Sequence, residues 1–62
     1  MFTAEQKADE AKREVAYRRR VYARLVEEGK MKQAAASERI AIMVEIEADY
    51  RGQVAAAEPG LF

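Results

Sequence analysis

Apolar residues recur with a helical period in two long segments of this 62-residue chain, one on each side of Gly29. From about residue 4 to residue 28 they return every three or four positions and form one narrow stripe. From about residue 33 to residue 57 they spread over roughly 200° of arc at 100° per residue. The pattern therefore predicts two amphipathic helices, the second with an unusually wide apolar face.

Local signals mark where these helices begin and end. Thr3 and Gln6 have the spacing of a capping box, which predicts a first helix that begins beside them. Gly29 is the left-handed residue that commonly follows a last helical turn, so residues 29–32 are expected to form the connection. The second helix lacks a good N-cap residue. We expect it to end before an apolar tail at residues 58–62, where Glu-Pro-Gly precedes Leu-Phe.

The predicted fold is all-α, an antiparallel hairpin of two helices that are each roughly 38 Å long. The first stripe has only alanine in its N-terminal half, so packing is expected to be thin near the chain start and dense near the turn. Large apolar residues of the two stripes form the predicted hairpin core: Val15, Tyr22, Leu25, Val26, Ile40, Met43, Val44 and Tyr50.

One neighbouring helix covers an apolar arc of little more than about 100°, so the second helix is expected to need a further partner. A lone hairpin of this size has too small a core for high stability. We therefore predict self-association, with a dimer that forms a four-helix bundle as the first choice. The alternative is that Ile42 is simply an exposed aliphatic residue. The predicted oligomer interface consists of apolar positions outside the core stripes: Ala35, Ile42, Ile46, Tyr17 and Val21.

Composition narrows the possible chemistry. The chain has no Cys and no His, so neither a disulfide nor a structural zinc site is expected, and no cofactor is predicted. Glu45, Glu47 and Asp49 are two residues apart on a helix and point to different sides, so no catalytic carboxylate pair is predicted. The sequence also lacks a signal peptide pattern and an apolar run long enough to span a bilayer. We expect a soluble cytoplasmic protein that is not an enzyme and does not bind membranes.

Basic residues are concentrated in the first helix, where residues 1–30 hold 8 basic and 6 acidic side chains. Consecutive arginines at 18–20 point three ways, but Arg13, Arg20 and Arg24 share a solvent face with Tyr17. This face is predicted to bind a protein partner, with nucleic acid as the alternative. Nearby glutamates and a net charge of zero favour a solvated face over a nucleic-acid site.

Two charged residues fall close to the apolar stripes. Arg18 and Glu47 form either a diagonal or intersubunit ion pair that sets the register, or extend separately to the rim of the interface. Antiparallel pairing is expected to bring Arg18 near Met43, and Glu47 near Arg13 or Glu14.

The segment Arg18-Arg19-Arg20-Val21-Tyr22-Ala23-Arg24-Leu25-Val26-Glu27-Glu28-Gly29-Lys30-Met31 resembles part of a group of small uncharacterised proteins encoded by phages and prophages. Residues 38–43 and 46–50 extend the resemblance to about two thirds of the chain. Ala23 and Leu25 stand where the family usually has Pro and Trp. The resemblance implies a phage or prophage origin and implies no particular activity.

Overall fold

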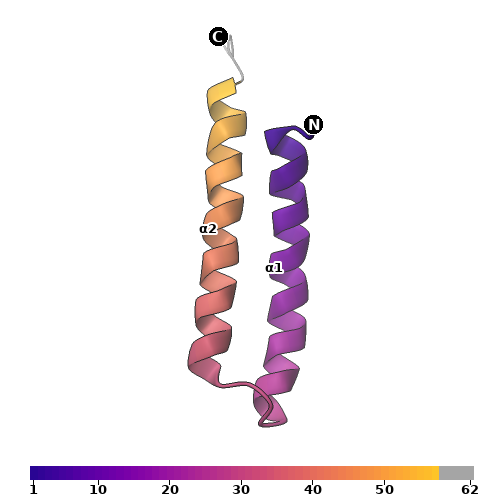
Figure 1. The fold of residues 1–62 in the computed structure, drawn as a ribbon, viewed down its shortest axis with the longest axis vertical. Coiled ribbons are helices and arrows are strands. Elements are labelled where there is room, and N and C mark those ends of the chain that lie inside the picture. The colour runs from indigo at the N-terminus through magenta and orange to yellow at the C-terminus, as the bar shows by residue number, and fades with distance from the viewer. Residues whose placement is uncertain (58–62) are drawn as a thin grey trace.

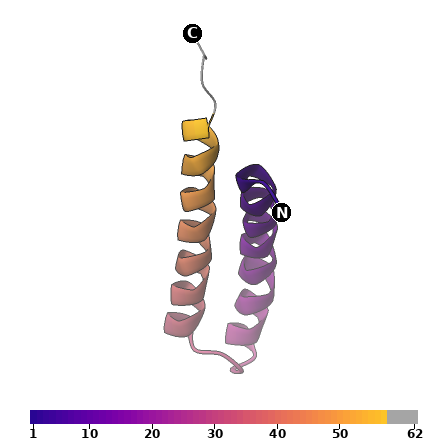
Figure 2. The ribbon, with the colours of Figure 1, turned by 45° about the horizontal axis from the view of Figure 1, so that its top comes forward.

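The computed structural model describes residues 1–57, which form two helices packed side by side, α1 (Ala4–Glu27) and α2 (Gln33–Ala57) (Figure 1). The helices run antiparallel, and the N-terminus and the end of α2 lie at the same end of the molecule in two views (Figures 1 and 2). The predicted all-α hairpin is confirmed. The predicted apolar tail at residues 58–62 lies outside the described residues.

The start of α1 is the capping box expected from the sequence. The Gln6 backbone N–H donates to the Thr3 hydroxyl oxygen at 3.1 Å, and the Thr3 backbone N–H donates to Gln6 Oε1 at 2.9 Å. Two backbone N–H groups that have no partner within the helix are satisfied in this way.

The end of α1 is one residue earlier than expected, at Glu27, because Glu28 is the C-cap and the turn begins there. Gly29 has a left-handed φ of 74°, and its N–H donates to the Val26 carbonyl at 3.0 Å. The Lys30 N–H donates to the Leu25 carbonyl at 2.8 Å. These two bonds form a Schellman motif, which requires a left-handed residue at the position of Gly29.

The start of α2 relies on the backbone and on one link between polar side chains. The Ala36 N–H donates to the Lys32 carbonyl at 3.0 Å, and Gln33 Nε2 donates to the Ser37 hydroxyl at 3.0 Å. Gly52 lies inside α2, and a Cβ added to it would meet nothing within 4 Å. The helix therefore continues through a residue that disfavours it, without a packing reason for glycine.

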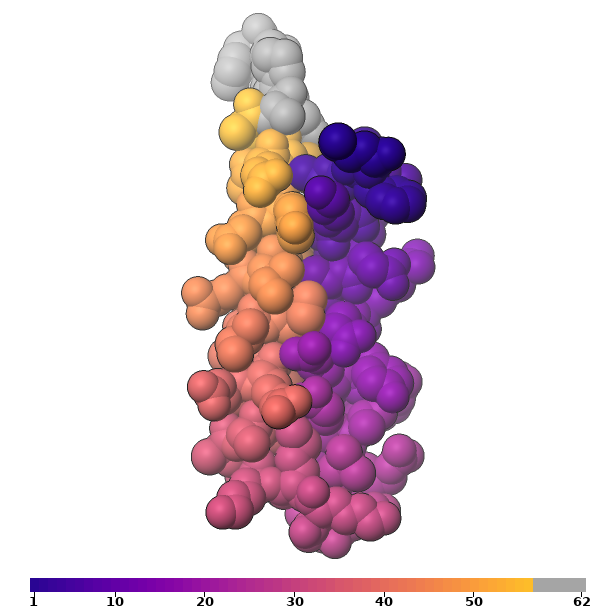
Figure 3. Space-filling model, in the orientation of Figure 1, coloured from indigo at the N-terminus to yellow at the C-terminus, as the bar shows by residue number. Residues whose placement is uncertain are grey.

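The interface between α1 and α2 is built on small side chains. Among the described residues, the buried apolar side chains are Ala8 at 0% exposure, Ala36 at 2%, Ala11 at 5% and Val15 at 9%. Three of these four are alanine, which lets the helix backbones approach closely. The space-filling view shows side chains of the two helices meeting along one continuous line of contact (Figure 3).

The expectation of thin packing at the chain start is wrong, since the most completely covered residues of α1 are Ala8 and Ala11 in its N-terminal half. A small side chain between two close helices is fully covered, whereas a large one extends past its single neighbour. Most larger residues of the predicted core are accordingly only half-buried: Tyr22, Leu25, Val26, Ile40, Met43 and Tyr50.

Val44 does not belong to the core, contrary to the prediction, because 39% of it is exposed. Its helical position explains this result. The side chain lies about 80° around α2 from the buried Ala36, at the edge of the contact with α1.

Polar contacts fix the register between the helices. Arg51 Nη2 lies 3.1 Å from Asp9 Oδ1, and the ammonium of Lys7 lies 5.5 Å from the centre of the Tyr50 ring. Nearer the turn, Arg18 donates from Nη1 to the Arg39 carbonyl at 2.9 Å. Residues near the start of α1 therefore face residues near the end of α2. Neither helix of the described part has the length and apolar character needed to cross a bilayer.

Candidate functional site

The hairpin has two flanks, one on each side of the contact between the helices. One of them carries three of the four large apolar side chains that are exposed within the described helices, namely Tyr17, Ile42 and Ile46. On this flank a groove is lined by four residues of α1 and three of α2: Lys7, Glu10, Ala11, Glu14, Met43, Ile46 and Tyr50. We call it the apolar flank and define it by the five residues that sequence analysis assigned to an oligomer interface: Tyr17, Val21, Ala35, Ile42 and Ile46.

These residues come together because of helical spacing. Ile42 is four residues before Ile46, which lines the groove, and Ala35 is two turns before Ile42. In α1, Tyr17 is one turn after Glu14 of the same groove, and Val21 is one turn after Tyr17.

Exposure is high at the centre of the apolar flank. Ile42 and Tyr17 are each 50% exposed and Ile46 is 36% exposed, while Val21 and Ala35 are half-buried. Large aliphatic side chains with this exposure retain contact with water that a further partner would remove.

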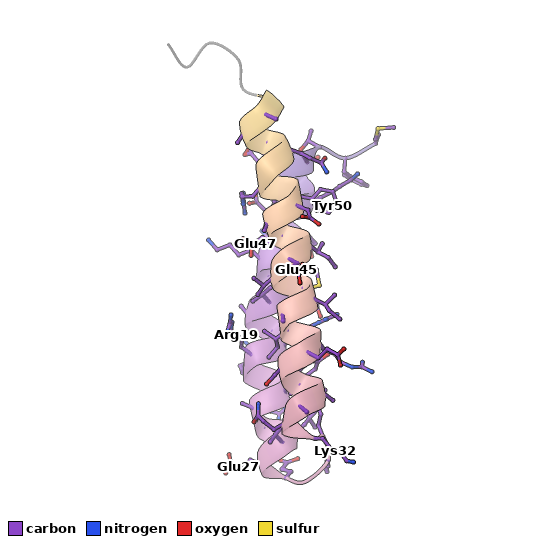
Figure 4. All side chains as sticks on the ribbon, turned by 90° about the vertical axis from the view of Figure 1, so that its left-hand side faces the viewer. Arg19, Glu27, Lys32, Glu45, Glu47 and Tyr50 are labelled. Atoms are coloured by element: carbon purple, nitrogen blue, oxygen red, sulfur yellow. The ribbon has the colours of Figure 1, made fainter. Side chains whose placement is uncertain are left out.

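The opposite flank carries the ion pairs of Arg51, and we call it the polar flank; Arg19 there borders a groove lined otherwise mainly by apolar residues, among them Val26 and Ile40. Arg51 contacts two carboxylates there, Asp9 at 3.1 Å and Glu47 at 3.5 Å. Figure 4 shows Glu47 and Arg19 on one side of α2 and Tyr50 on the other. Val44 lies two turns before Arg51 and so shares its side of the helix.

The outward face of α1 carries the predicted partner-binding residues Arg13, Tyr17, Arg20 and Arg24, all of which are exposed. The Arg20 guanidinium carbon lies 5.7 Å from the centre of the Tyr17 ring, in the range of a cation–π contact. Arg13 Nη1 lies 3.7 Å from Glu10 Oε1, so part of the positive charge is balanced locally.

Arg18 and Glu47 do not pair with each other within the hairpin. Arg18 donates from Nε to Glu14 Oε2 at 2.8 Å, and Glu47 lies against Arg51. Each charge has a partner one turn away on its own helix, a geometry that needs no burial of either charge. A carboxylate cluster does not form either, since Glu45 and Glu47 point in different directions (Figure 4).

The hairpin separates charge along its length, which the linear sequence conceals because both helices contribute to each half. The turn half, residues 17–44, carries seven basic and three acidic side chains, for a net charge of +4. The open half, residues 1–16 and 45–57, carries four basic and seven acidic side chains, for a net charge of −3. Folding therefore turns a nearly neutral chain into an electric dipole.

Comparisons of this chain with protein-family models, with curated proteins and with solved structures found no match.

Proposed function

We propose that this chain is a small non-enzymatic interaction protein of phage or prophage type, which self-associates through the apolar flank. Two hairpins form a four-helix bundle, and each presents the outward basic face of α1 to a protein partner. The cytoplasm is the proposed location.

This proposal rests on large aliphatic side chains of α2 that are exposed beside a core of small side chains. Among the residues whose burial is described, those buried within the hairpin are three alanines and one valine, whereas Ile42 and Ile46 retain 50% and 36% exposure. Burial of apolar area stabilises by roughly 25 cal/mol per Å², so the exposed isoleucines of the apolar flank are a contribution that a single hairpin leaves unused. A second hairpin placed there supplies the second layer that a stable bundle needs.

Two apolar residues of similar exposure on opposite flanks provide the test. Ile46→Lys places a charge on the apolar flank, and Val44→Lys places the same charge on the polar flank, where the native residue is 39% exposed. Sedimentation equilibrium of the unaltered chain is expected to show a dimer at micromolar concentration. Ile46→Lys should weaken dimerisation at least about tenfold, because each dimer loses two buried isoleucines, and Val44→Lys should leave it unchanged.

Circular dichroism of both variants provides the control for helix content. A strict monomer that still melts cooperatively would overturn the proposal of self-association. Equal weakening by both substitutions would show that the contact is not on the apolar flank.

A nucleic-acid-associated accessory role is the second candidate, and the charge separation favours it. The turn half has a net charge of +4, and it includes Arg20 over Tyr17, an arrangement that can contact phosphate and stack on a base. Binding to random duplex and single-stranded DNA across a range of salt concentrations separates the two functions. Phosphate contacts give a steep negative salt dependence, and no binding at low salt would eliminate this candidate.

A further inference from the structure

A regular seam runs along α2 through the apolar flank. Its positions alternate in spacing between four and three residues, which is the spacing of a helix face that packs against another helix. Ala35 on this seam is half-buried and the other five residues are exposed. The seam consists of Ala35, Arg39, Ile42, Ile46, Asp49 and Gln53.

The seam is symmetric in position and opposite in charge about its centre. The centre of the seam is level with Val44. Ile42 and Ile46 are each two residues from this centre, and Arg39 and Asp49 are each five residues from it. These two charges are ten residues apart, about 15 Å along one helix, which is too far for them to pair with each other. Within residues 1–57 neither side chain forms an ion pair.

We propose that the partner on this seam is a second copy of the chain in antiparallel orientation, related by a two-fold axis level with Val44. This inference rests on the self-association proposed above and adds its geometry. The axis sets Ile42 of one copy against the partner's Ile46, and Arg39 against the partner's Asp49. Both contacts occur twice, because a two-fold interface uses the same surface on each copy.

Charge selects this orientation over the parallel one. A parallel dimer places Arg39 against the partner's Arg39 and Asp49 against the partner's Asp49, and both contacts are repulsive. The antiparallel dimer also places the turn half of each copy, with its net charge of +4, against the open half of the other, with its net charge of −3. The local seam and the whole hairpin therefore favour the same arrangement.

A charge exchange on the seam tests the proposal. Arg39→Asp replaces two attractive contacts per dimer by repulsive ones and is expected to weaken dimerisation about tenfold in sedimentation equilibrium at low salt. The double variant Arg39→Asp with Asp49→Arg restores attraction and should regain the affinity. Arg19→Asp makes the same change of charge on the polar flank and should have no such effect. Weakening that the double variant does not reverse would overturn the antiparallel pairing.

A distance measurement gives a second, independent test that does not alter the seam. The chain has no Cys, so Lys32→Cys accepts a single spin label in the exposed turn. Lys32 is twelve residues from the axis level, so the antiparallel dimer separates the two label sites by about 36 Å along the bundle. A parallel dimer holds them within about 20 Å, on adjacent helices.

The outcomes distinguish this inference from the proposal on which it depends. A long distance in a sedimenting dimer supports both. A short distance overturns the antiparallel orientation and leaves self-association standing. A labelled chain that sediments as a monomer at micromolar concentration overturns both.

Discussion

Gly29 and Gly52 are the same residue type with opposite effects on the fold. Gly29 has a φ of 74° in the Schellman motif that ends α1, a conformation that costs a residue with a Cβ roughly 1 kcal/mol or more. Gly52 lies within α2, where glycine costs about 1 kcal/mol relative to alanine. At neither position would an added Cβ meet another atom within 4 Å, so backbone conformation alone decides the outcome.

Alanine substitution of the two glycines is therefore expected to move stability in opposite directions. Gly29→Ala should lower the free energy of unfolding by about 1 kcal/mol, and Gly52→Ala should raise it by about 0.5–1 kcal/mol. Urea denaturation followed by circular dichroism, at one fixed protein concentration, measures both. A loss of stability in Gly52→Ala would show that the end of α2 has a contact that depends on glycine.

At the scale of helix packing, the distance between α1 and α2 is set by the alanines. Ala8 is fully covered, at 0% exposure, so a larger side chain there has no space without moving the helices apart. Ala16 is exposed on the same helix and provides a matched site where a larger side chain meets solvent.

Ala8→Leu is expected to destabilise the hairpin by about 1–3 kcal/mol, whereas Ala16→Leu should change stability by less than about 0.5 kcal/mol. The two substitutions add the same atoms and have the same helix propensity, so their difference isolates packing. Thermal melting of both variants measures that difference. Equal stabilities would contradict close helix approach at Ala8.

The helices were predictable from the sequence because their signals are local. Thr3 with Gln6 identifies the start of α1, and Gly29 identifies its end, since the groups that satisfy each end lie within a few residues. The burial of Ala8 and the exposure of Val44 were not predictable in this way, because both depend on how closely the second helix approaches and on which side it lies.

The same distinction applies to the candidate surfaces: features within one helix were predictable from the sequence, and features that join the two helices were not. Helical periodicity alone grouped Ile42 with Ile46 and Arg20 with Tyr17, and the structure places these pairs on exposed surfaces. The contact between Asp9 and Arg51 and the charge separation between the two halves require the register of the hairpin, which joins residues far apart in sequence. Neither is visible within one helix.

For the whole molecule, the proposed dimer makes stability depend on concentration. When folding and association are coupled, tenfold dilution removes about 1.4 kcal/mol from the stability of the dimer. Two chains of 62 residues have an unfolding entropy of about 0.26 kcal/mol/K, so the melting temperature should fall by about 5 °C for each tenfold dilution. Circular dichroism melts between 1 mM and 1 μM, in cells of matched optical path, measure this slope. Ile46→Lys should melt at a lower temperature than the unaltered chain at every concentration, and Val44→Lys should keep both the temperature and the slope. A melting temperature that does not change over that range would mean that the small alanine core stabilises the hairpin alone, and the exposed isoleucines would then need another partner.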